Sequence, residues 1–244
     1  MSRPGLAPSA SRRRFLWLSL ALAAATPFGA SAAEARKLKI GVIGSGRVGG
    51  TLGAAWLAAG HQVMFSSLDL EQDKALAAKL GAGASAGTPR EAAAYGEVLL
   101  VSVPYSALPQ LGKELGDLVK GKIIIDTSNP VASRDGEIVA SALEKGPGLT
   151  TAALLPGARI VRGFNAIGYT RMQEFARTQS RTVGMPIAGD DANAIAIASG
   201  LVREAGLEPV LVGPLAMGRH LRPGTPLAGE HSPEQIRKIA ATLK

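Results

Sequence analysis

A glycine pattern near residue 44 constrains the fold of this chain more than any other feature. Gly44, Gly46 and Gly49 follow the G-x-G-x-x-G spacing. The apolar run at residues 38–43 predicts a buried strand before them, and a helical apolar pattern follows and is expected to close at Gly60. A strand, a glycine loop and a helix in this order are typical of a dinucleotide-binding unit.

Each glycine of this loop has a separate mechanical reason. Gly44 permits the tight turn out of the strand, and Gly49 lets the helix pack close to that strand. Gly46 has no Cβ, so a pyrophosphate can approach the backbone, and the helix N-terminus offers N–H groups and a positive dipole end. The alternative is a glycine-rich turn that only packs. We predict that the loop binds a dinucleotide through Gly44, Ser45, Gly46, Arg47, Val48 and Gly49.

Strands and helices alternate along the first half of the chain. Further apolar strands are expected at residues 62–66, 98–103 and 122–126, with helical patterns between them. This order predicts an α/β fold with a doubly wound parallel sheet, the Rossmann architecture. We assign residues 33–155 to this domain. Residues 156–244 form a smaller C-terminal α/β portion on the same sheet, and residues 135–156 are expected to be an irregular crossing between the halves.

The carboxyl ends of the predicted strands are expected to converge on one crevice, because ligands of such sheets bind there. The prolines at two of these ends either shape the floor of the nucleotide site or simply terminate their strands. The residues that we expect at the crevice, besides the glycine loop, are Ser66, Ser67, Val103, Pro104, Asn129 and Pro130.

The residues after the second strand bear on the choice between NAD and NADP. Enzymes that select NAD place an acid near this point, about 20 residues past the glycines, to bind the ribose 2′-hydroxyl. Here Ser66 and Ser67 stand in that place, and the first acid, Asp69, is expected to cap the next helix. Small hydroxyls tolerate a 2′-phosphate, so we predict NADP rather than NAD. Arg47 is either a phosphate partner or a solvated charge.

Composition excludes several other classes of site. The 244-residue chain has no cysteine, which excludes disulfides, thiolate catalysis and zinc–thiolate sites. Its three histidines lie far apart in sequence, so we expect no metal site. The formal charge of +8 falls to +4 once residues 1–32, with four arginines and no acid, are set aside. We therefore expect no nucleic-acid partner.

Residues 1–32 predict an export signal. Arg12, Arg13 and Arg14 precede an apolar segment, residues 15–25, that is too short to span a membrane, and residues 30–32 fit a small-residue cleavage site. Residues 11–16 also match the twin-arginine pattern, Ser-Arg-Arg-x-Phe-Leu. We expect a periplasmic or otherwise exported protein with no membrane span after cleavage. An ordinary signal for unfolded export and an uncleaved anchor are the alternatives.

A series of motifs extends the pattern beyond the glycine loop. In order they are Gly-Ser-Gly-Arg-Val-Gly, Ser-Val-Pro, Asp-Thr-Ser-Asn-Pro, Gly-Phe-Asn-Ala-Ile, Ala-Gly-Asp-Asp and Val-Gly-Pro-Leu, at residues 44, 102, 126, 163, 188 and 212. Over about residues 38–215 the chain resembles the NADPH-dependent reductases of the deazaflavin coenzyme (factor 420). It also resembles the related N-terminal domain of membrane metalloreductases.

The resemblance implies a mechanism and a set of contacts. Hydride would pass directly between the nicotinamide and a stacked second carrier, so we name no catalytic residue, and we interpret Tyr105 as a packing residue. Asn165 would lie at the mouth of the second cofactor's cleft. The chain departs from the family at Leu68, where an arginine is usual, and at Arg222, where an acid is common. The implied NADP contacts are the glycine loop and Ser67, with Val103, Pro104, Asn129 and Pro130 on the nicotinamide side.

These observations favour an NADP-dependent oxidoreductase that passes hydride to a flavin-like or deazaflavin acceptor. One alternative is a non-catalytic exported nucleotide-binding module. Another is an enzyme like the imine or β-hydroxyacid reductases, although the long helical C-terminal domain of those enzymes is missing. The expected partner is a small-molecule redox acceptor, and the chain could also form a homodimer.

Overall fold

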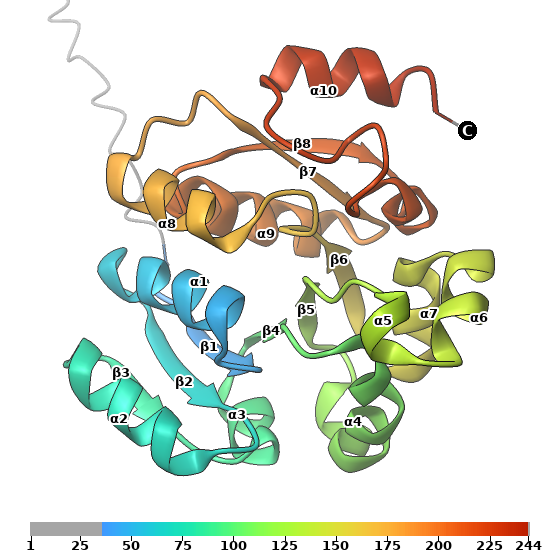
Figure 1. Ribbon diagram of the computed structural model, residues 1–244. Helices are drawn as coiled ribbons and strands as arrows, with labels where there is room; N and C mark the ends of the chain where they lie inside the picture. The colour runs from blue at the N-terminus through green and yellow to red at the C-terminus, as the bar shows by residue number, and fades with distance from the viewer. Residues whose placement is uncertain (1–35, 244) are drawn as a thin grey trace, which may run out of the picture. The chain divides into compact units, whose positions relative to one another are not determined.

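The computed structural model describes residues 36–243, which are built around one sheet (Figure 1). Its strands are β1 (Lys39–Ile43), β2 (Gln62–Ser66), β3 (Ala84–Ala86), β4 (Val98–Val101), β5 (Ile123–Asp126), β6 (Arg159–Arg162), β7 (Gly184–Gly189) and β8 (Glu208–Gly213). They pair in the order β3-β2-β1-β4-β5-β6-β7-β8. The predicted fold class is confirmed. The predicted export signal, residues 1–32, lies outside the described residues.

The order of the strands reverses between β1 and β4. These two strands are not consecutive in sequence, yet they pair in parallel with Ile43 opposite Val101, so they end at the same level. Ligands of doubly wound sheets bind outside the carboxyl ends of the strands at such a switch point. The fold therefore places the glycine loop, which follows β1, at the expected position for a ligand.

Helices connect the strands and cover both faces of the sheet. They are α1 (Arg47–Ala58), α2 (Leu70–Leu80), α3 (Pro89–Tyr95), α4 (Leu108–Leu115), α5 (Ala132–Asp135), α6 (Ile138–Lys145), α7 (Pro147–Leu154), α8 (Tyr169–Thr178), α9 (Ala192–Glu204) and α10 (Pro233–Ala240). Within residues 36–243, no helix is both long and apolar enough to cross a membrane.

Two apolar cores lie on opposite faces of the sheet. Ile40 of β1 and Leu100 of β4 pack with Trp56 of α1 in one core. Leu99 of β4 packs with Leu108 of α4 in the other. Successive strand residues point to opposite faces, so a strand covered on both sides is apolar throughout, as the sequence of β4 is.

Side chains cap the N-termini of three helices, and the capping residues are of types that favour this position. The Asp69 side chain accepts from Gln72 N at the start of α2. Thr88 and Glu91 form a capping box at the start of α3, and Asp191 caps α9. Each cap satisfies an N–H group that the first turn of a helix leaves without an intrahelical partner.

The irregular crossing predicted at residues 135–156 is wrong. Three short helices, α5, α6 and α7, occupy most of this region. Gly136 and Gly146 adopt left-handed φ values of 61° and 94° between these helices, and Pro147 begins α7 at a position where proline is tolerated. Glycine and proline here separate helices rather than prevent them.

The sheet is also not parallel throughout. β7 runs antiparallel to β6, with Arg162 opposite Ala188, and β8 is parallel to β7. The connecting helix α8 lies beside α1 (Figure 1), rather than along β6. It therefore does not return the chain to the end of the sheet at which β6 starts. Strand β7 therefore starts at the end of the sheet where β6 finishes, so it must run antiparallel to β6.

Other differences concern the bounds of elements. The strand expected at residues 98–103 ends at Val101, and the helix expected to follow is interrupted. It consists of a 3-10 turn (Tyr105–Ala107), α4, and a second 3-10 turn (Gly116–Val119) that begins at a left-handed glycine. The first helix ends at Ala58, with Gly60 in the left-handed conformation just beyond its end.

Candidate dinucleotide-binding site

The glycine loop is built on two close backbone contacts. Gly44 has a φ of 97°, and a Cβ added to it would lie 2.2 Å from the carbonyl oxygen of Ser102. A Cβ on Gly49 would lie 2.0 Å from the carbonyl oxygen of Gly44. A side chain at either position would separate the loop from β4 or from α1. These two glycines therefore have the roles that the sequence predicts for them.

Gly46 differs from its neighbours because its space is open. A Cβ added there would meet no atom within 4 Å. Gly46 is the N-cap residue of α1 and has no side chain to cap the helix, so the first N–H groups of α1 face this space. An anion would find hydrogen-bond donors and the positive end of a helix dipole at this point.

A cleft of about 340 Å³ opens beside the loop. Gly44 and Gly46 line one side of it, and Ser67 and Leu68 lie where the chain leaves β2. Apolar and small residues form most of the rest, which is usual for the adenosine part of a ligand. The remaining lining residues are Ile43, Pro89, Ser102, Val103, Pro104, Ala107, Gln110, Leu111 and Glu114.

An acid that the sequence analysis did not consider lies behind this cleft. Asp73 is fully buried on the first turns of α2. Its carboxylate accepts a hydrogen bond from Ser45 Oγ and a second, of 2.8 Å, from Ser67 Oγ. A signal was present in the sequence, because Asp73 lies four residues after the capping Asp69 and thus on the same face of the helix.

Two predicted contact residues lie away from this cleft. Ser66 is completely buried, and its hydroxyl donates to the carbonyl of Val42 while its carbonyl accepts from Gly44 N and Ser45 N. It therefore supports the loop from behind. The Arg47 guanidinium lies 5.3 Å from the ring centroid of Tyr169 on α8, and Arg47 lines a different groove, between α1, α2 and α8.

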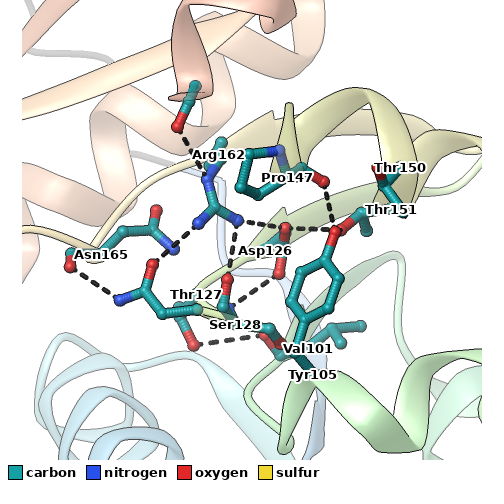
Figure 2. A network of polar contacts seen from close by, with 12 residues as sticks. Val101, Tyr105, Asp126, Thr127, Ser128, Pro147, Thr150, Thr151, Arg162 and Asn165 are labelled. Atoms are coloured by element: carbon teal, nitrogen blue, oxygen red, sulfur yellow. Dashed lines mark hydrogen bonds and ion pairs between the residues drawn. The ribbon is translucent and has the colours of Figure 1, made fainter. Parts of the chain in front are cut away.

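The strand ends of β5 and β6 are joined by a buried polar network (Figure 2). Arg162, fully buried, donates to Asp126 Oδ2 at 2.7 Å, to the carbonyl of Ser128 at 2.8 Å and to Asn129 Oδ1 at 2.8 Å. Asn129 Nδ2 in turn donates to the carbonyl of Asn165 at 2.9 Å. The network fixes the loop after β5 against the loop after β6.

The Asp126–Arg162 ion pair was also missed by the sequence analysis. Each partner is a charged residue at the end of an otherwise buried strand, which was the available signal. Neither side chain is exposed to solvent. Desolvation makes such a pair costly, whereas the loss of one partner leaves an uncompensated buried charge. We interpret both as positioning residues.

Tyr105 packs at the end of β4, as predicted. Its hydroxyl donates to the carbonyl of Pro147 at 2.7 Å and lies 3.4 Å from Thr151 Oγ1. Burial raises the pKa of Tyr105 above its usual value, although the hydrogen bond with Thr151 opposes this shift. Tyr105 therefore stays protonated at neutral pH and ties the start of the α4 region to α7.

Asn165 has polar atoms that no protein group satisfies. The residue is 3% exposed, and neither Oδ1 nor Nδ2 of its amide has a hydrogen-bond partner; the same holds for the nearby Ser128 Oγ. The preceding residue, Phe164, holds a left-handed φ of 60° and packs edge-on against Trp56. A strained residue and unsatisfied polar groups at one strand end are typical of a functional position.

The structure thus brings most of the predicted residues to three places, one of which is the groove between α1, α2 and α8 that Ser45 and Arg47 line. Gly44, Gly46, Ser67, Val103 and Pro104 line one cleft. Asn129 and Asn165 meet where β5 and β6 end. Pro130, which follows Asn129 in the sequence, is buried. Among residues 36–243, no group of three or more His, Cys, Asp or Glu side chains could hold a metal ion.

Comparison with known families finds a match in the first part of the described chain. The sequence profile of the family described as NADP oxidoreductase, coenzyme F420-dependent, matches residues 39–130. The matched part is less than half of the 244-residue chain. The match contains the glycine loop, the 340 Å³ cleft and the loop after β5. It confirms the resemblance stated for these motifs. No curated protein matches the sequence significantly.

Solved structures share the fold at low sequence identity. A hypothetical protein from Sinorhizobium meliloti has a TM-score of 0.68 and 20% identity over 82% of this chain and 97% of its own. A candidate F420-dependent NADP-reductase from Arthrobacter sp. FB24 has a TM-score of 0.63 and 21% identity over 75% and 87%, respectively. An imine reductase from Pseudomonas sp. has a TM-score of 0.56 and 17% identity over 75% and 58%.

These likenesses establish the Rossmann type of fold. The chain spans little more than half of the imine reductase, so the remainder of that enzyme has no counterpart in the aligned part. Over residues 39–130 the chain is therefore similar to the NADP-dependent oxidoreductases that the family profile describes.

Proposed function

We propose that this protein is an oxidoreductase that transfers a hydride between a nicotinamide dinucleotide and a flavin-like or deazaflavin acceptor. The observation that carries the proposal is the open face of Gly46, where the first N–H groups of α1 meet empty space beside the 340 Å³ cleft. The family of residues 39–130 supplies the class of reaction, and its description includes NADP.

We assign each part of the dinucleotide to particular residues of the site. The glycine loop and the N-terminus of α1 would hold the pyrophosphate. Ser67 and Leu68 would lie beside the adenosine ribose, because they follow the second strand. Val103 and Pro104, after β4, would form the floor on the way to the nicotinamide.

The bound nicotinamide supplies the carbon that gives or takes the hydride. The chain positions the ring, and its apolar strand ends exclude water from it. Ser128 and Asn165 add a hydroxyl and an amide without protein partners at the β5 and β6 ends. We propose that these groups bind the amide end of the nicotinamide, which needs both a donor and an acceptor, or a carbonyl of the acceptor, which needs a donor.

Calorimetric titration of the full chain with NADPH and NADH, followed by a turnover assay, tests this function. We expect dissociation constants of about 1 µM to 1 mM, typical of enzyme substrates. The assay then follows loss of nicotinamide absorbance with FMN or a deazaflavin as acceptor. A folded protein that binds neither dinucleotide would contradict the proposal.

A second candidate is a nucleotide-binding module without an acceptor site. The burial of Asn165, at 3% exposure, favours it, because a buried amide offers little surface to an acceptor. Tight dinucleotide binding with no hydride transfer to any flavin or deazaflavin would support the module and exclude the oxidoreductase.

We further propose that the protein is exported by the twin-arginine route. The support is the sequence of residues 11–16, which precedes a short apolar segment. This route carries folded proteins, so a dinucleotide could travel in its site to a compartment where free nucleotide is scarce.

A further inference from the structure

A buried carboxylate accepts hydrogen bonds from one serine hydroxyl of the glycine loop and from one that lines the candidate cleft. Asp73 Oδ1 accepts from Ser45 Oγ, in the glycine loop, and Asp73 Oδ2 accepts from Ser67 Oγ, after β2. Asp73 has no exposed surface, so it acts on a ligand through these two hydroxyls rather than by contact.

Each hydroxyl has only one proton to donate. A carboxylate has only acceptors, so Ser45 and Ser67 must donate to Asp73. The second acceptor near Ser67 Oγ, the carbonyl of Asp69 at 3.2 Å, also belongs to the protein. The hydroxyl of Ser66 likewise donates to the carbonyl of Val42. Of these serines only Ser67 lines the cleft, and its hydroxyl also accepts from Asp69 N at 3.1 Å, so toward the cleft it can offer its remaining lone pair but no proton.

The charges around the cleft also disfavour a 2′-phosphate. The residues described as lining it include one acid, Glu114, and no lysine or arginine. The exposed side chain that follows Ser67 is Leu68. Arg47 stacks over Tyr169 and lines the other groove. A 2′-phosphate here would meet lone pairs and a nearby carboxylate, whereas a 2′-hydroxyl can donate to Ser67 Oγ.

We propose that Asp73 is a specificity-determining residue that works against the 2′-phosphate, so that this chain accepts NADH at least as well as NADPH. The inference rests on the proposed dinucleotide function. It goes beyond that function because it names which dinucleotide the site favours and the residue responsible, and it sets this chain apart from the NADP type of its family.

The test compares two dissociation constants in the full chain. Calorimetry with NADH and with NADPH gives their ratio for the wild type, for Asp73→Asn and for Asp73→Ala. The wild type is expected to bind NADH at least as tightly as NADPH. Release of the serine protons and removal of the charge should improve NADPH binding relative to NADH by about tenfold, the usual scale of one hydrogen bond to a charged group.

Two further variants separate this role from a general effect of charge or packing. Glu71→Gln removes an acid from the same turn of α2, but its side chain is 81% exposed and pairs with Lys74, so the ratio should not change. Ser67→Ala in the wild-type background removes the acceptor for the ribose and should weaken NADH more than NADPH. Far-UV circular dichroism and thermal unfolding verify that each variant is folded.

The outcomes distinguish this inference from the function on which it rests. Dinucleotide binding with a strong preference for NADPH, and an equal ratio in the wild type and both Asp73 variants, would overturn the role of Asp73 and leave the proposed function intact. A folded wild type that binds neither dinucleotide would overturn both. A ratio that shifts toward NADPH in both variants but not in Glu71→Gln supports the inference.

Discussion

The three glycines of the glycine loop have different roles, although they are chemically identical. Gly44 and Gly49 lie so close to backbone oxygens that a Cβ would come within 2.2 Å of one, whereas Gly46 faces open space. A substitution at Gly44 or Gly49 therefore tests folding, and a substitution at Gly46 tests binding. The spacing alone does not reveal this difference.

Gly46→Glu should abolish dinucleotide binding in a folded protein. The φ of Gly46 is −62°, which any residue can adopt, and the new side chain has room, so the fold should tolerate it. Its carboxylate would occupy and repel the pyrophosphate position, weakening binding by at least about a hundredfold. Calorimetry measures the loss. Gly46→Ala is the control and should weaken binding far less; equal loss in both variants would contradict the assignment.

Arg162→Met should cost about 3–5 kcal/mol of unfolding free energy, because it leaves the Asp126 carboxylate buried without its ion-pair partner. Urea unfolding measures the change. Arg159→Met on the same strand is the matched control: its side chain is 36% exposed and lies 3.6 Å from Asp191, so the cost should be below about 1 kcal/mol. Similar costs at both positions would contradict the role of the buried pair.

At the scale of elements, short helices and turns tie the strand ends together. Asp135, in α5, accepts from Val131 N at 2.8 Å and from Ser106 N at 3.2 Å, and the Arg134 guanidinium also donates to it. This carboxylate therefore links the segment after β5 to the 3-10 turn after β4. The floor of the candidate site depends on both segments.

The stability of the protein should acquire an acid-sensitive part from Asp135. Burial alone would raise the pKa of Asp135, but the hydrogen bonds from Arg134, Val131 and Ser106 outweigh it and lower the pKa to about 2. The unfolded chain therefore takes up the proton first as the pH falls. The contribution is complete above the usual value of 3.8 and is lost as the pH falls through about 2.

Asp135→Asn removes this titration. Between about pH 5 and pH 2, the unfolding free energy of the wild type should fall more steeply than that of the variant. Urea unfolding at a series of pH values measures both slopes. Asp117→Asn is the control, because that carboxylate is 87% exposed in its ion pair with Lys120. Parallel slopes for the wild type and Asp135→Asn would contradict the assignment.

At the scale of the whole molecule, the proposed export makes a prediction of its own. Replacing Arg12 and Arg13 by lysine should keep the full-length chain inside the cytoplasm, because the twin-arginine route reads both arginines. Cell fractionation with antibody detection measures the distribution. Arg3→Lys is the control, since Arg3 lies outside the motif. Export of the double variant at the level of the wild type would contradict this route.

Much of the fold was predictable because its signals are local. The glycine loop between β1 and α1, the cap at Asp69 and the box at Thr88 and Glu91 each lie within a few residues of the element that they define. The three helices at residues 132–154 were not predicted, since their separating glycines are equally compatible with a loop. The direction of β7 depends on where α8 packs, and no local pattern records that position.

The sequence by itself determined the class of fold, the position of the glycine loop and the similarity of residues 39–130 to one family, because these follow from spacing within short segments. Only the tertiary structure decided which polar groups meet. Asp126 reaches Arg162 from a separate strand, and Asp73 holds two serines, one of them 28 residues away. Such pairs form because a sheet covered on both faces leaves each buried charge only the partners that the topology brings to it.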